Sequence, residues 1–316
     1  MQMLEIVRYS QVHKAVWDAF VAGSKNGTFL FFRDYMEYHA HRVTDHSLLF
    51  FLKGKLIALL PANEVGQELH SHSGLSYGGI ISGNSMRAAI MLRVFDAMLV
   101  YLRKVGFTRL NYKAIPHIYH LTPAEEDLYA LYRSGASLCR RELNSVICLD
   151  NPLPYSQLRK RKLKDVQAES LNLQQSFDFV SFMKLEQELL QTKYNLIPTH
   201  SSEEMEKLAQ QFPEHIKLFA AYEAAEMVAG IIIYETETVV HCQYIGATER
   251  GKHLSALDAL TDFLLTSIYK QKRYFSFGIS TEQGGRYLNE NLVRNKESYG
   301  ARAVVQDFYT LELEGK

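Results

Sequence analysis

The chain has 316 residues, 47% of them hydrophobic and 22% charged, and its formal net charge is zero. This composition is typical of a soluble globular protein, and the length is sufficient for two domains of ordinary size. The neutral balance argues against a dedicated nucleic-acid-binding protein, although a local basic patch is compatible with it.

The cysteines and the N-terminus bear on the cellular compartment. Cys139, Cys148 and Cys242 show no metal-ligand spacing, and free thiols in a reducing cytosol are the simplest interpretation. The segment 1–5 does not resemble a signal peptide, and no apolar run reaches membrane-spanning length. We therefore expect a cytoplasmic protein without membrane insertion and without a metal.

The first half of the chain alternates short strands with helices. Two apolar strands across a Lys-Gly-Lys turn predict a β-hairpin, and a later amphipathic helix lies between two further strands. In chain order we expect a strand at 4–9, helices at 13–22 and 29–41, strands at 47–52, 56–61 and 68–73, a helix at 86–105 and a strand at 109–115.

The second half begins at a junction where the Asn-Pro-Leu-Pro segment 151–154 interrupts regular structure and the basic run 159–164 follows. Two apolar, β-branched strands joined by a polar link then predict a second hairpin. Ser255 and Asp258 form a potential capping box for the helix after that hairpin. We expect helices at 178–193 and 203–211, strands at 227–234 and 239–245, a helix at 255–271, a strand at 274–279, a helix ending near 297 and a strand pair within 303–313.

The two halves resemble each other. Segment 49–60 aligns with 218–231, and at a constant offset 69–72 aligns with 240–243. Each block continues with a glycine-containing loop, a long helix and an aromatic strand. Self-similarity over such a long period indicates two copies of one αβ unit, with chance convergence as the alternative. The predicted domains are residues 1–150 and 151–316.

The order strand, loop, helix, strand in 227–281 resembles the acyl-donor core of the GNAT superfamily of N-acyltransferases. A helix start after a long strand presents backbone N–H groups and a positive dipole end, which suits a pyrophosphate. Superfamily members usually carry Gln/Arg-x-x-Gly-x-Gly/Ala there, and Thr248–His253 keeps one glycine of that pattern. The resemblance implies an α+β protein with two tandem GNAT-like domains, each a mixed, mostly antiparallel sheet flanked by helices.

The doubled unit with its proline-broken, basic junction resembles the FemABX group, the aminoacyltransferases that build peptidoglycan cross-bridges. The strings 74–79 and 277–282 add to this resemblance. Fem enzymes that use charged tRNA often carry a long helical hairpin, and no coiled-coil heptads occur in this sequence. This departure favours an acyl thioester over aminoacyl-tRNA as the donor.

The resemblance therefore implies N-acyl transfer from acetyl-CoA or another acyl-CoA to an amine of a sugar or peptide precursor of cell-envelope type, bound between the domains. A Fem-type transfer from aminoacyl-tRNA and a catalytically degenerate, ligand-binding GNAT pair are the alternatives.

Three residues are candidates for the chemistry. Strand alternation predicts that His241, Gln243 and Ile245 share one face, with Cys242 and Tyr244 on the other. His241 is the candidate general base and Gln243 its neighbour, with a core histidine as the alternative for His241. Backbone N–H groups near 244–247 are candidate donors to an oxyanion. Tyr299 is the candidate acid for the leaving thiolate, with a packing role as the alternative.

Two further sets are candidate binding residues. Donor binding is assigned to Ile245, Gly246, Ala247, Arg250, Gly251, Lys252, His253 and Ser255. Acceptor binding is assigned to His72, Tyr77, Ser280, Glu282, Arg286 and Asn289. A helix cap is the alternative for the segment 280–287, and a phosphate site or a solvated helix face are the alternatives for the basic run.

Overall fold

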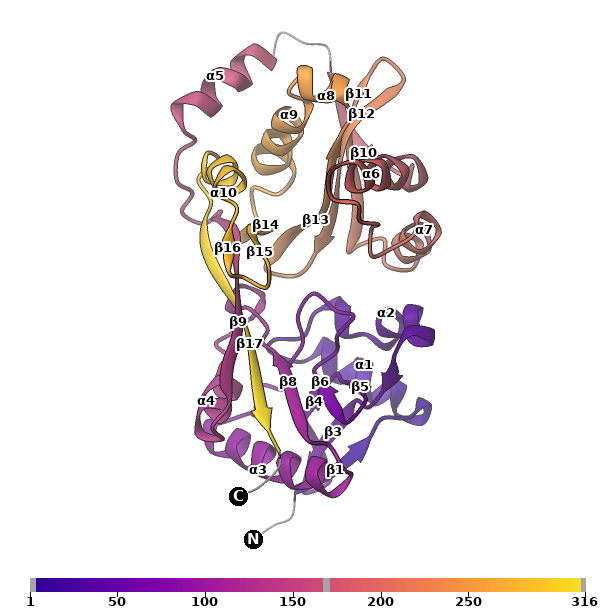
Figure 1. Ribbon diagram of the computed structural model, residues 1–316, viewed down its shortest axis with the longest axis vertical. Coiled ribbons are helices and arrows are strands. Elements are labelled where there is room, and N and C mark those ends of the chain that lie inside the picture. Colours follow the sequence, from indigo (N-terminus) through magenta and orange to yellow (C-terminus); the bar gives the residue numbers. More distant parts are fainter. Residues whose placement is uncertain (1–3, 167–170, 314–316) are drawn as a thin grey trace. The chain divides into compact units, whose positions relative to one another are not determined.

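The computed structural model describes residues 4–166 and 171–313 and divides into two compact units. Unit 1 comprises the described residues of Met1–Glu142, Gln283–Tyr287 and Val305–Lys316, and unit 2 those of Leu143–Glu282 and Leu288–Val304. The chain passes between the units within the long strands β9 (Ser137–Cys148) and β17 (Arg302–Glu312) (Figure 1). The units therefore are not two consecutive halves, because the last strand contributes to unit 1.

Unit 1 contains an antiparallel sheet in the order β1-β3-β4-β7. Its strands are β1 (Leu4–Arg8), β3 (Leu48–Leu52), β4 (Lys55–Leu60) and β7 (Ile81–Ser82). The predicted Lys-Gly-Lys hairpin is confirmed between β3 and β4. Lys53 and Gly54 both have positive φ, which is the backbone twist that a two-residue hairpin requires.

A second group of strands in unit 1 has the order β17-β8-β6-β5-β2. Its short members are β2 (Thr44–Asp45), β5 (Asn63–Val65), β6 (Glu68–His70) and β8 (Arg109–Lys113). Strands β6 and β8 are parallel and the other pairs are antiparallel. The crossover between β6 and β8 contains α3 (Ala88–Lys104), whose buried side Met91, Val94, Phe95, Met98 and Leu102 forms the core with the β3–β4 hairpin.

The helix expected at 29–41 is wrong as a continuous element. The structure has a 3₁₀ turn at Phe29–Phe31, helix α2 at Arg33–Met36 and a second 3₁₀ segment at Glu37–Arg42. Phe32 is extended and His39 has non-helical backbone angles, so the chain turns twice to bury its aromatic side chains. The other helices of unit 1 are α1 (Lys14–Ala22) and α4 (Glu126–Arg133).

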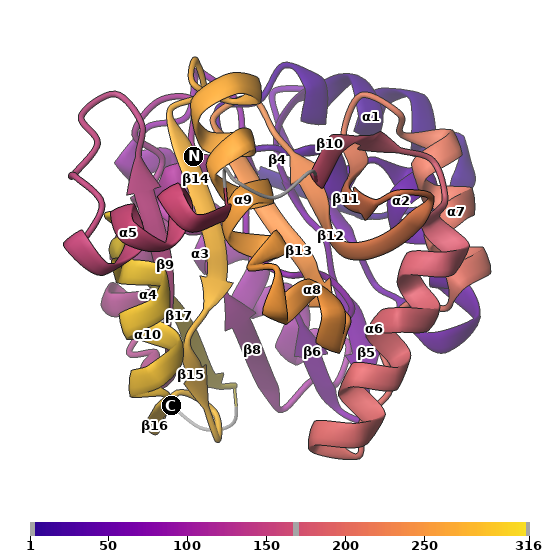
Figure 2. The same ribbon diagram turned by 90° about the horizontal axis from the view of Figure 1, so that it is seen from above.

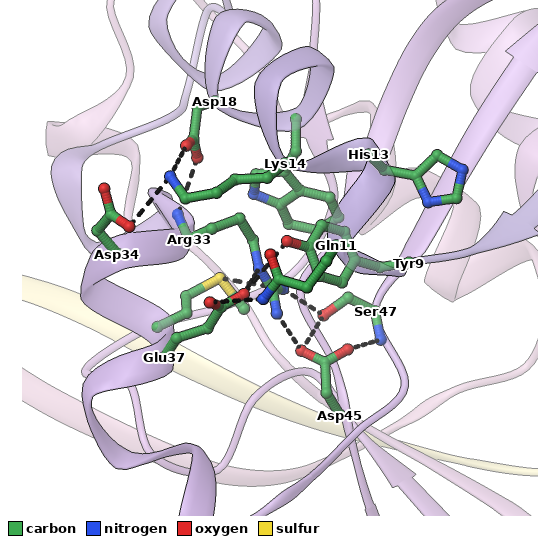
Figure 3. A network of polar contacts seen from close by, with 12 residues as sticks. Tyr9, Gln11, His13, Lys14, Asp18, Arg33, Asp34, Glu37, Asp45 and Ser47 are labelled. Atoms are coloured by element: carbon green, nitrogen blue, oxygen red, sulfur yellow. Dashed lines mark hydrogen bonds and ion pairs between the residues drawn. The ribbon is translucent and has the colours of Figure 1, made fainter.

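A buried arginine ties these short helices to the sheet of unit 1. Figure 3 shows Arg33 between Glu37 and Asp45, with N···O distances of 3.0 and 2.7 Å. Its guanidinium also stacks on the ring of Tyr9 at 3.6 Å. Arg33 therefore stabilises the fold of unit 1. Truncating its side chain would leave the carboxylates of Glu37 and Asp45 without this counter-charge.

Unit 2 is built on a sheet in the order β10-β11-β12-β13-β14-β9. New strands here are β10 (Leu171–Ser176), β11 (Ile216–Glu223), β12 (Glu226–Glu235), β13 (Val239–Ala247) and β14 (Tyr274–Ile279). Of the five strand pairs described for this sheet, β13 and β14 run parallel and the other four are antiparallel. Both units are thus mixed, mostly antiparallel sheets with helices, as expected.

Helices cover both faces of the unit 2 sheet (Figure 1 and Figure 2). One face carries α6 (Phe179–Tyr194) and α7 (Ser202–Gln211). The other carries α8 (Glu249–His253) and α9 (Ala256–Phe263), which continues as a π-helical turn at Leu264–Ile268. The remaining helices of unit 2 are α5 (Gln157–Val166) and α10 (Glu290–Glu297).

Two expectations for unit 2 and the C-terminus are wrong. The strand pair within 303–313 is the single strand β17, with no turn residue inside it. The proposed capping box is absent, because Ser255 has φ 50° and its side chain makes no capping bond. The start expected for this helix is close to that of α9, at Ala256, and the separate helix α8 precedes it with the side chain of Thr248 as its cap.

Candidate active site

The strands β13 and β14 separate shortly after they meet. Their parallel pairing covers only Val239–His241 against Tyr274–Ser276, whereas β13 continues to Ala247 beside β12. Beyond His241, the edge of β13 that faces β14 therefore directs its backbone N–H and C=O groups into a gap. This gap is where the candidate site lies.

A pocket of about 500 Å³ fills this gap within unit 2, and we call it the acyl pocket. Its walls come from β13, the start of α8 and α9, β14, α10 and one side of α6, with Lys162 contributed by α5. The lining residues are Lys162, Glu186, Leu189, Leu190, Ile245, Ala247, Gly251, Lys252, Ser255, Leu257, Asp258, Thr261, Phe277, Leu292, Asn295, Lys296 and Tyr299.

A β-bulge in β13 decides which side chains reach this pocket. Ile233 pairs with Cys242 and Ile232 with Tyr244, so Gln243 is an extra residue without an opposite partner. The predicted alternation is therefore wrong beyond Cys242, because a bulge inserts one residue and shifts the following side chains to the other face. Cys242 lies in the core beneath α9, whereas the Tyr244 hydroxyl is 2.7 Å from His200 Nδ1 before α7. Ile245 consequently faces the acyl pocket.

The donor loop is a short capped helix rather than an open loop. The hydroxyl of Thr248 accepts a hydrogen bond from the Gly251 N–H at 3.0 Å. Gly251 lies so close to β12 that a Cβ there would overlap the carbonyl oxygen of Val228. The single glycine that the sequence keeps is thus the one required for the helix start to approach the sheet.

Five of the eight predicted donor residues line the acyl pocket, namely Ile245, Ala247, Gly251, Lys252 and Ser255. The other three lie elsewhere. Gly246 faces α6, where a Cβ would be 2.8 Å from Glu186 Oε2. Arg250 forms a two-pronged ion pair with Glu223, and His253 is exposed. Lys252 is itself ion-paired with Glu249. Because carboxylates neutralise both cations of the loop, its electrostatic attraction for a pyrophosphate is reduced.

Lys296 is a buried titratable group of this pocket that was not among the candidate residues. It lies on α10, is 6% exposed, and donates to the carbonyl oxygens of Gly278 and Ile279 and to the hydroxyl of Ser280 at 3.2, 2.6 and 2.9 Å. Burial lowers the pKa of Lys296 to about 8. The spacing of Leu292, Lys296 and Tyr299, which all line the pocket, is the signal that could have identified it.

His241 and Gln243 do not belong to the pocket lining. His241 is half-buried, and its Nδ1 is 3.3 Å from the hydroxyl of Ser276 on β14. Burial and, next, the charge of Lys296 lower the pKa of His241 to about 4. The imidazole is therefore neutral and weakly basic at neutral pH, which agrees with the alternative of a core histidine.

Tyr299 lines the pocket, and its hydroxyl is bound by Asp258, another lining residue. The hydroxyl donates to Asp258 Oδ1 at 2.7 Å, and the guanidinium of Arg159 lies 3.8 Å above the ring. Burial, and then the charge of Asp258, raises the pKa of Tyr299 well above its usual value. This arrangement favours the packing alternative over proton donation.

The predicted acceptor residues of unit 2 are part of the turn that leads into α10. Ser280 is buried beneath Lys296, and Asn289 caps α10 by accepting the Leu292 N–H at 3.0 Å. The Asn289 amide donates to Glu282 at 2.8 Å. The helix cap found here is therefore Asn289, which lies outside the segment 280–287 to which the cap alternative referred. Arg286 belongs to unit 1.

The predicted acceptor residues of unit 1 are buried. His72 is 2% exposed and has φ 61°, and Tyr77, 3% exposed, donates its hydroxyl to Thr28 Oγ1 at 3.0 Å. In this unit β6 and β8 also diverge, but the chain itself occupies the place between them. The N–H of Ile80 donates to the Tyr112 hydroxyl at 2.6 Å. An open donor gap is accordingly a feature of unit 2.

Within 4–166 and 171–313, no cluster of three or more His, Cys, Asp or Glu side chains is arranged to hold a metal ion. In the same ranges, no helix has the length and apolar character needed to cross a bilayer.

No protein-family model matches the sequence, and no curated protein matches it either. Solved structures do resemble the fold. One described as FemX has a TM-score of 0.67 at 9% identity, covering 96% of each chain. The L-PGS of Bacillus licheniformis has a TM-score of 0.56 at 14% identity, covering 82% of each chain. A tandem GNAT protein from the clavulanic acid biosynthesis pathway has a TM-score of 0.50 at 10% identity, covering 99% of this chain and 100% of that one. The chain therefore has a tandem GNAT-like, FemABX-related fold.

Proposed function

We propose that this protein is an acyltransferase that moves an acyl group from acetyl-CoA or another acyl-CoA to an amine through the acyl pocket of unit 2. One observation carries the proposal. The pocket combines the exposed backbone edge of β13 with Lys296, a buried amine whose pKa is lowered to about 8. Buried groups with perturbed pKa values that line a pocket are candidates for function.

The reaction forms a C–N bond and breaks a C–S bond, the amine loses a proton, and the departing thiolate gains one. Backbone N–H groups at the edge of β13 can bind the oxygen that becomes negative in the transition state. A thiol has an ordinary pKa of about 8.5, so an ammonium group with a pKa of about 8 can protonate a thiolate with almost no free-energy cost. We assign this role to Lys296, and the uptake of the amine proton to the buried carboxylate of Glu186.

The acceptor that we propose is an amine of a sugar or peptide precursor of cell-envelope type, and its support is the similarity to the structure described as FemX. We propose the cytoplasm as the site of the reaction, since the three cysteines are free thiols. If the protein transfers no acyl group, the alternative is that it binds a ligand without catalysing a reaction.

Aminoacyl-tRNA is a second candidate donor. Two observations support it: the cations of the donor loop are paired with carboxylates, and α5 places Lys162, whose amine is as far as 3.9 Å from Asp258, in the wall of the acyl pocket. An ester of RNA would use the same oxyanion donors, and Lys296 would protonate the departing ribose alkoxide, which becomes a hydroxyl, instead of a thiolate.

The test combines donor binding with turnover. Acetyl-CoA, free CoA and longer acyl-CoAs are titrated in a thermal-shift assay, where a ligand at a hundredfold its Kd stabilises the fold by about 2.7 kcal/mol. Thiol release with a panel of amines then compares wild type with Lys296→Gln. We expect kcat to fall about 10²- to 10⁴-fold in the variant while donor affinity stays similar, as for loss of a general acid.

Lys270→Gln, which changes an exposed lysine of the same unit, is the matched control and retains wild-type turnover. If no acyl-CoA gives a saturable shift of the melting temperature, the proposal that acyl-CoA is the donor is rejected. Full turnover in Lys296→Gln rejects the role of that lysine even if the donor is correct.

A further inference from the structure

A second pocket of unit 2, of about 650 Å³, lies between α5 and α10, and we call it the basic pocket. Its lining residues are Ser156, Leu158, Arg159, Lys162, Asn291, Arg294, Asn295, Glu297, Ser298 and Arg302. Lys162 and Asn295 line the acyl pocket as well. The two pockets are therefore neighbours that share part of a wall, and one extended ligand can reach both.

Four basic residues and one acidic residue line the basic pocket. Arg159 is structural, because it is 3% exposed, ion-paired with Asp258 and hydrogen-bonded to Asn295 at 2.6 Å. It holds the wall of the pocket through four guanidinium hydrogen bonds, to Asp258, Asn295 and Ser298.

The other three cations are poorly neutralised. The Lys162 amine is 3.9 Å from Asp258, and Arg294 is 3.9 Å from Glu290 on an exposed helix face. For Arg302, the hydrogen bond found among the described residues goes to the carbonyl oxygen of its neighbour Ala301 at 2.7 Å. Pairs this long and exposed contribute little.

Other cations of the same unit are treated differently. Lys217 and Lys272 hold the two oxygens of Glu235 at 2.8 and 2.9 Å, and Arg250 forms a two-pronged pair with Glu223. Among the described residues, Lys162, Arg294 and Arg302 of the basic pocket have no carboxylate as close as these. Like charges gathered around a cavity create a positive potential that attracts anions.

We propose that the basic pocket binds phosphate groups at the nucleotide end of the donor, while the acyl end of the same molecule occupies the acyl pocket. The second part of this inference rests on the proposed function. Arg294 and Arg302 provide planar donor forks that match phosphate oxygens, and Lys162 adds a point charge on the shared wall. The 3′-phosphoadenosine end of CoA and the terminal nucleotides of an RNA both present this chemistry.

Helix α5 also supplies the matched controls. Lys160, Arg161 and Lys164 belong to the same basic run and are exposed, yet they do not line the basic pocket. Replacing two of them with alanine changes the net charge of the protein as much as replacing two basic residues of the pocket. A non-specific attraction would respond to both groups, whereas a site responds only to the lining residues.

The experiment measures Kd by calorimetry for CoA, for dephospho-CoA, which lacks the 3′-phosphate, and for adenosine 3′,5′-bisphosphate. Wild type is compared with Arg294→Ala/Arg302→Ala and with the control Lys160→Ala/Lys164→Ala. We expect the arginine variant to bind CoA and the bisphosphate at least roughly tenfold more weakly than wild type does, as for lost charge-assisted hydrogen bonds. Dephospho-CoA should bind both proteins alike, and the control should behave as wild type.

A short RNA with a 3′-terminal adenosine forms the second arm. RNA binding that requires both arginines, together with no binding of CoA, supports the phosphate site and rejects acyl-CoA as the donor. CoA binding that is equal in wild type and the arginine variant overturns the inference and leaves the proposed function intact. Failure of the bisphosphate, CoA and RNA alike to bind overturns the inference directly. Unchanged thermal melting of the exposed-residue variants without ligand establishes that they fold.

Discussion

At the scale of single residues, two buried cations of this protein are held in opposite ways. Arg33 in unit 1 contacts two carboxylates and an aromatic ring. Lys296 in unit 2 donates to two carbonyl oxygens and a hydroxyl, which are neutral acceptors. A pKa lowered from 10.5 to about 8 corresponds to a cost of roughly 3 kcal/mol for the charged form. A lysine kept at that cost beside a pocket is better explained by chemistry than by stability.

Gly251 gives the prediction that belongs to this scale. Gly251→Ala places a Cβ on the carbonyl oxygen of Val228, so the start of α8 must move away from β12. We expect a loss of stability of about 1–3 kcal/mol, typical of overpacking, and weaker donor binding, measured by chemical denaturation and by calorimetry.

The control is Gly23→Ala in unit 1, where the nearest atom to an added Cβ is the Ala19 carbonyl oxygen at 3.7 Å and φ is −97°. This variant should match wild type in both measurements. Wild-type donor affinity in Gly251→Ala would show that the approach of α8 to β12 does not shape the donor site.

At the scale of elements, the sequence predicts the strands better than it predicts their irregularities. The bounds expected for β14 are those observed, because its apolar and aromatic residues are flanked by polar segments. The bulge at Gln243 leaves no mark in the pattern, since a bulge depends on the pairing with β12 and not on residue type. Thr248 and Ser255 are both good N-cap residue types, but only the Thr248 side chain caps a helix, α8, whereas Ser255 before α9 has a positive φ and makes no capping bond.

In the candidate site, too, the main elements were predictable from the sequence and the details of their packing were not. Periodicity identified the strand and the helix around the acyl pocket, and the resemblance to the GNAT donor loop identified the glycine between them, and five of the eight predicted donor residues lie in the wall. Lys296 was missed because the sequence predicts that a lysine on a short polar helix is exposed to solvent. Its burial follows from the turn Gly278–Ser280, which is distant in sequence and folds over the amine.

Helix α5 provides the prediction at this scale. Arg159 ties it to α9 through Asp258 and to α10 through Asn295. Removing one partner of a buried ion pair costs about 3–5 kcal/mol, because the other charge remains buried. In Arg159→Met we therefore expect the amides of α5 to exchange hydrogen faster by orders of magnitude, measured by mass spectrometry on peptides that cover 156–166.

Arg161→Met, an exposed neighbour on the same helix, is the control and should exchange as wild type does. Equal exchange in both variants would mean that α5 is held by its apolar contacts alone. The same peptides also report whether the shared wall of the acyl and basic pockets loosens with the helix.

At the scale of the whole molecule, the order of elements was enough to predict a doubled GNAT-like fold, since each repeat has its own hairpin, crossover helix and parallel strand. The path of the last strand was not predictable from local pattern. The residues of β17 look the same whichever sheet they join, and its pairing with β8 connects positions about 200 residues apart. Non-local pairing of this kind is decided by the packed fold.

Histidines with lowered pKa values in both units predict how the molecule responds to acid. Burial, with the charge of His39 next, lowers the pKa of His72 to about 3, and burial lowers that of His120 to about 4. In the unfolded chain a histidine titrates near 6.5. Between that value and the folded pKa the unfolded state binds more protons, so stability is complete above pH 6.5 and declines as the pH falls towards 3 or 4. His241 in unit 2 acts in the same direction.

His72→Asn isolates this contribution, because asparagine does not titrate and tolerates the φ of 61° at this position. We expect the decrease in unfolding free energy from pH 7 to pH 4 to be smaller than in wild type by about 3 kcal/mol, the value for a shift of this size. Trp17, the single tryptophan and fully buried in unit 1, reports the unfolding of that unit by fluorescence in urea. His253→Asn at an exposed position should leave the pH dependence as in wild type. A pH dependence in His72→Asn equal to that of wild type would mean that His72 gains its proton in the folded state as readily as in the unfolded one, and that the acid sensitivity of unit 1 arises from its carboxylates.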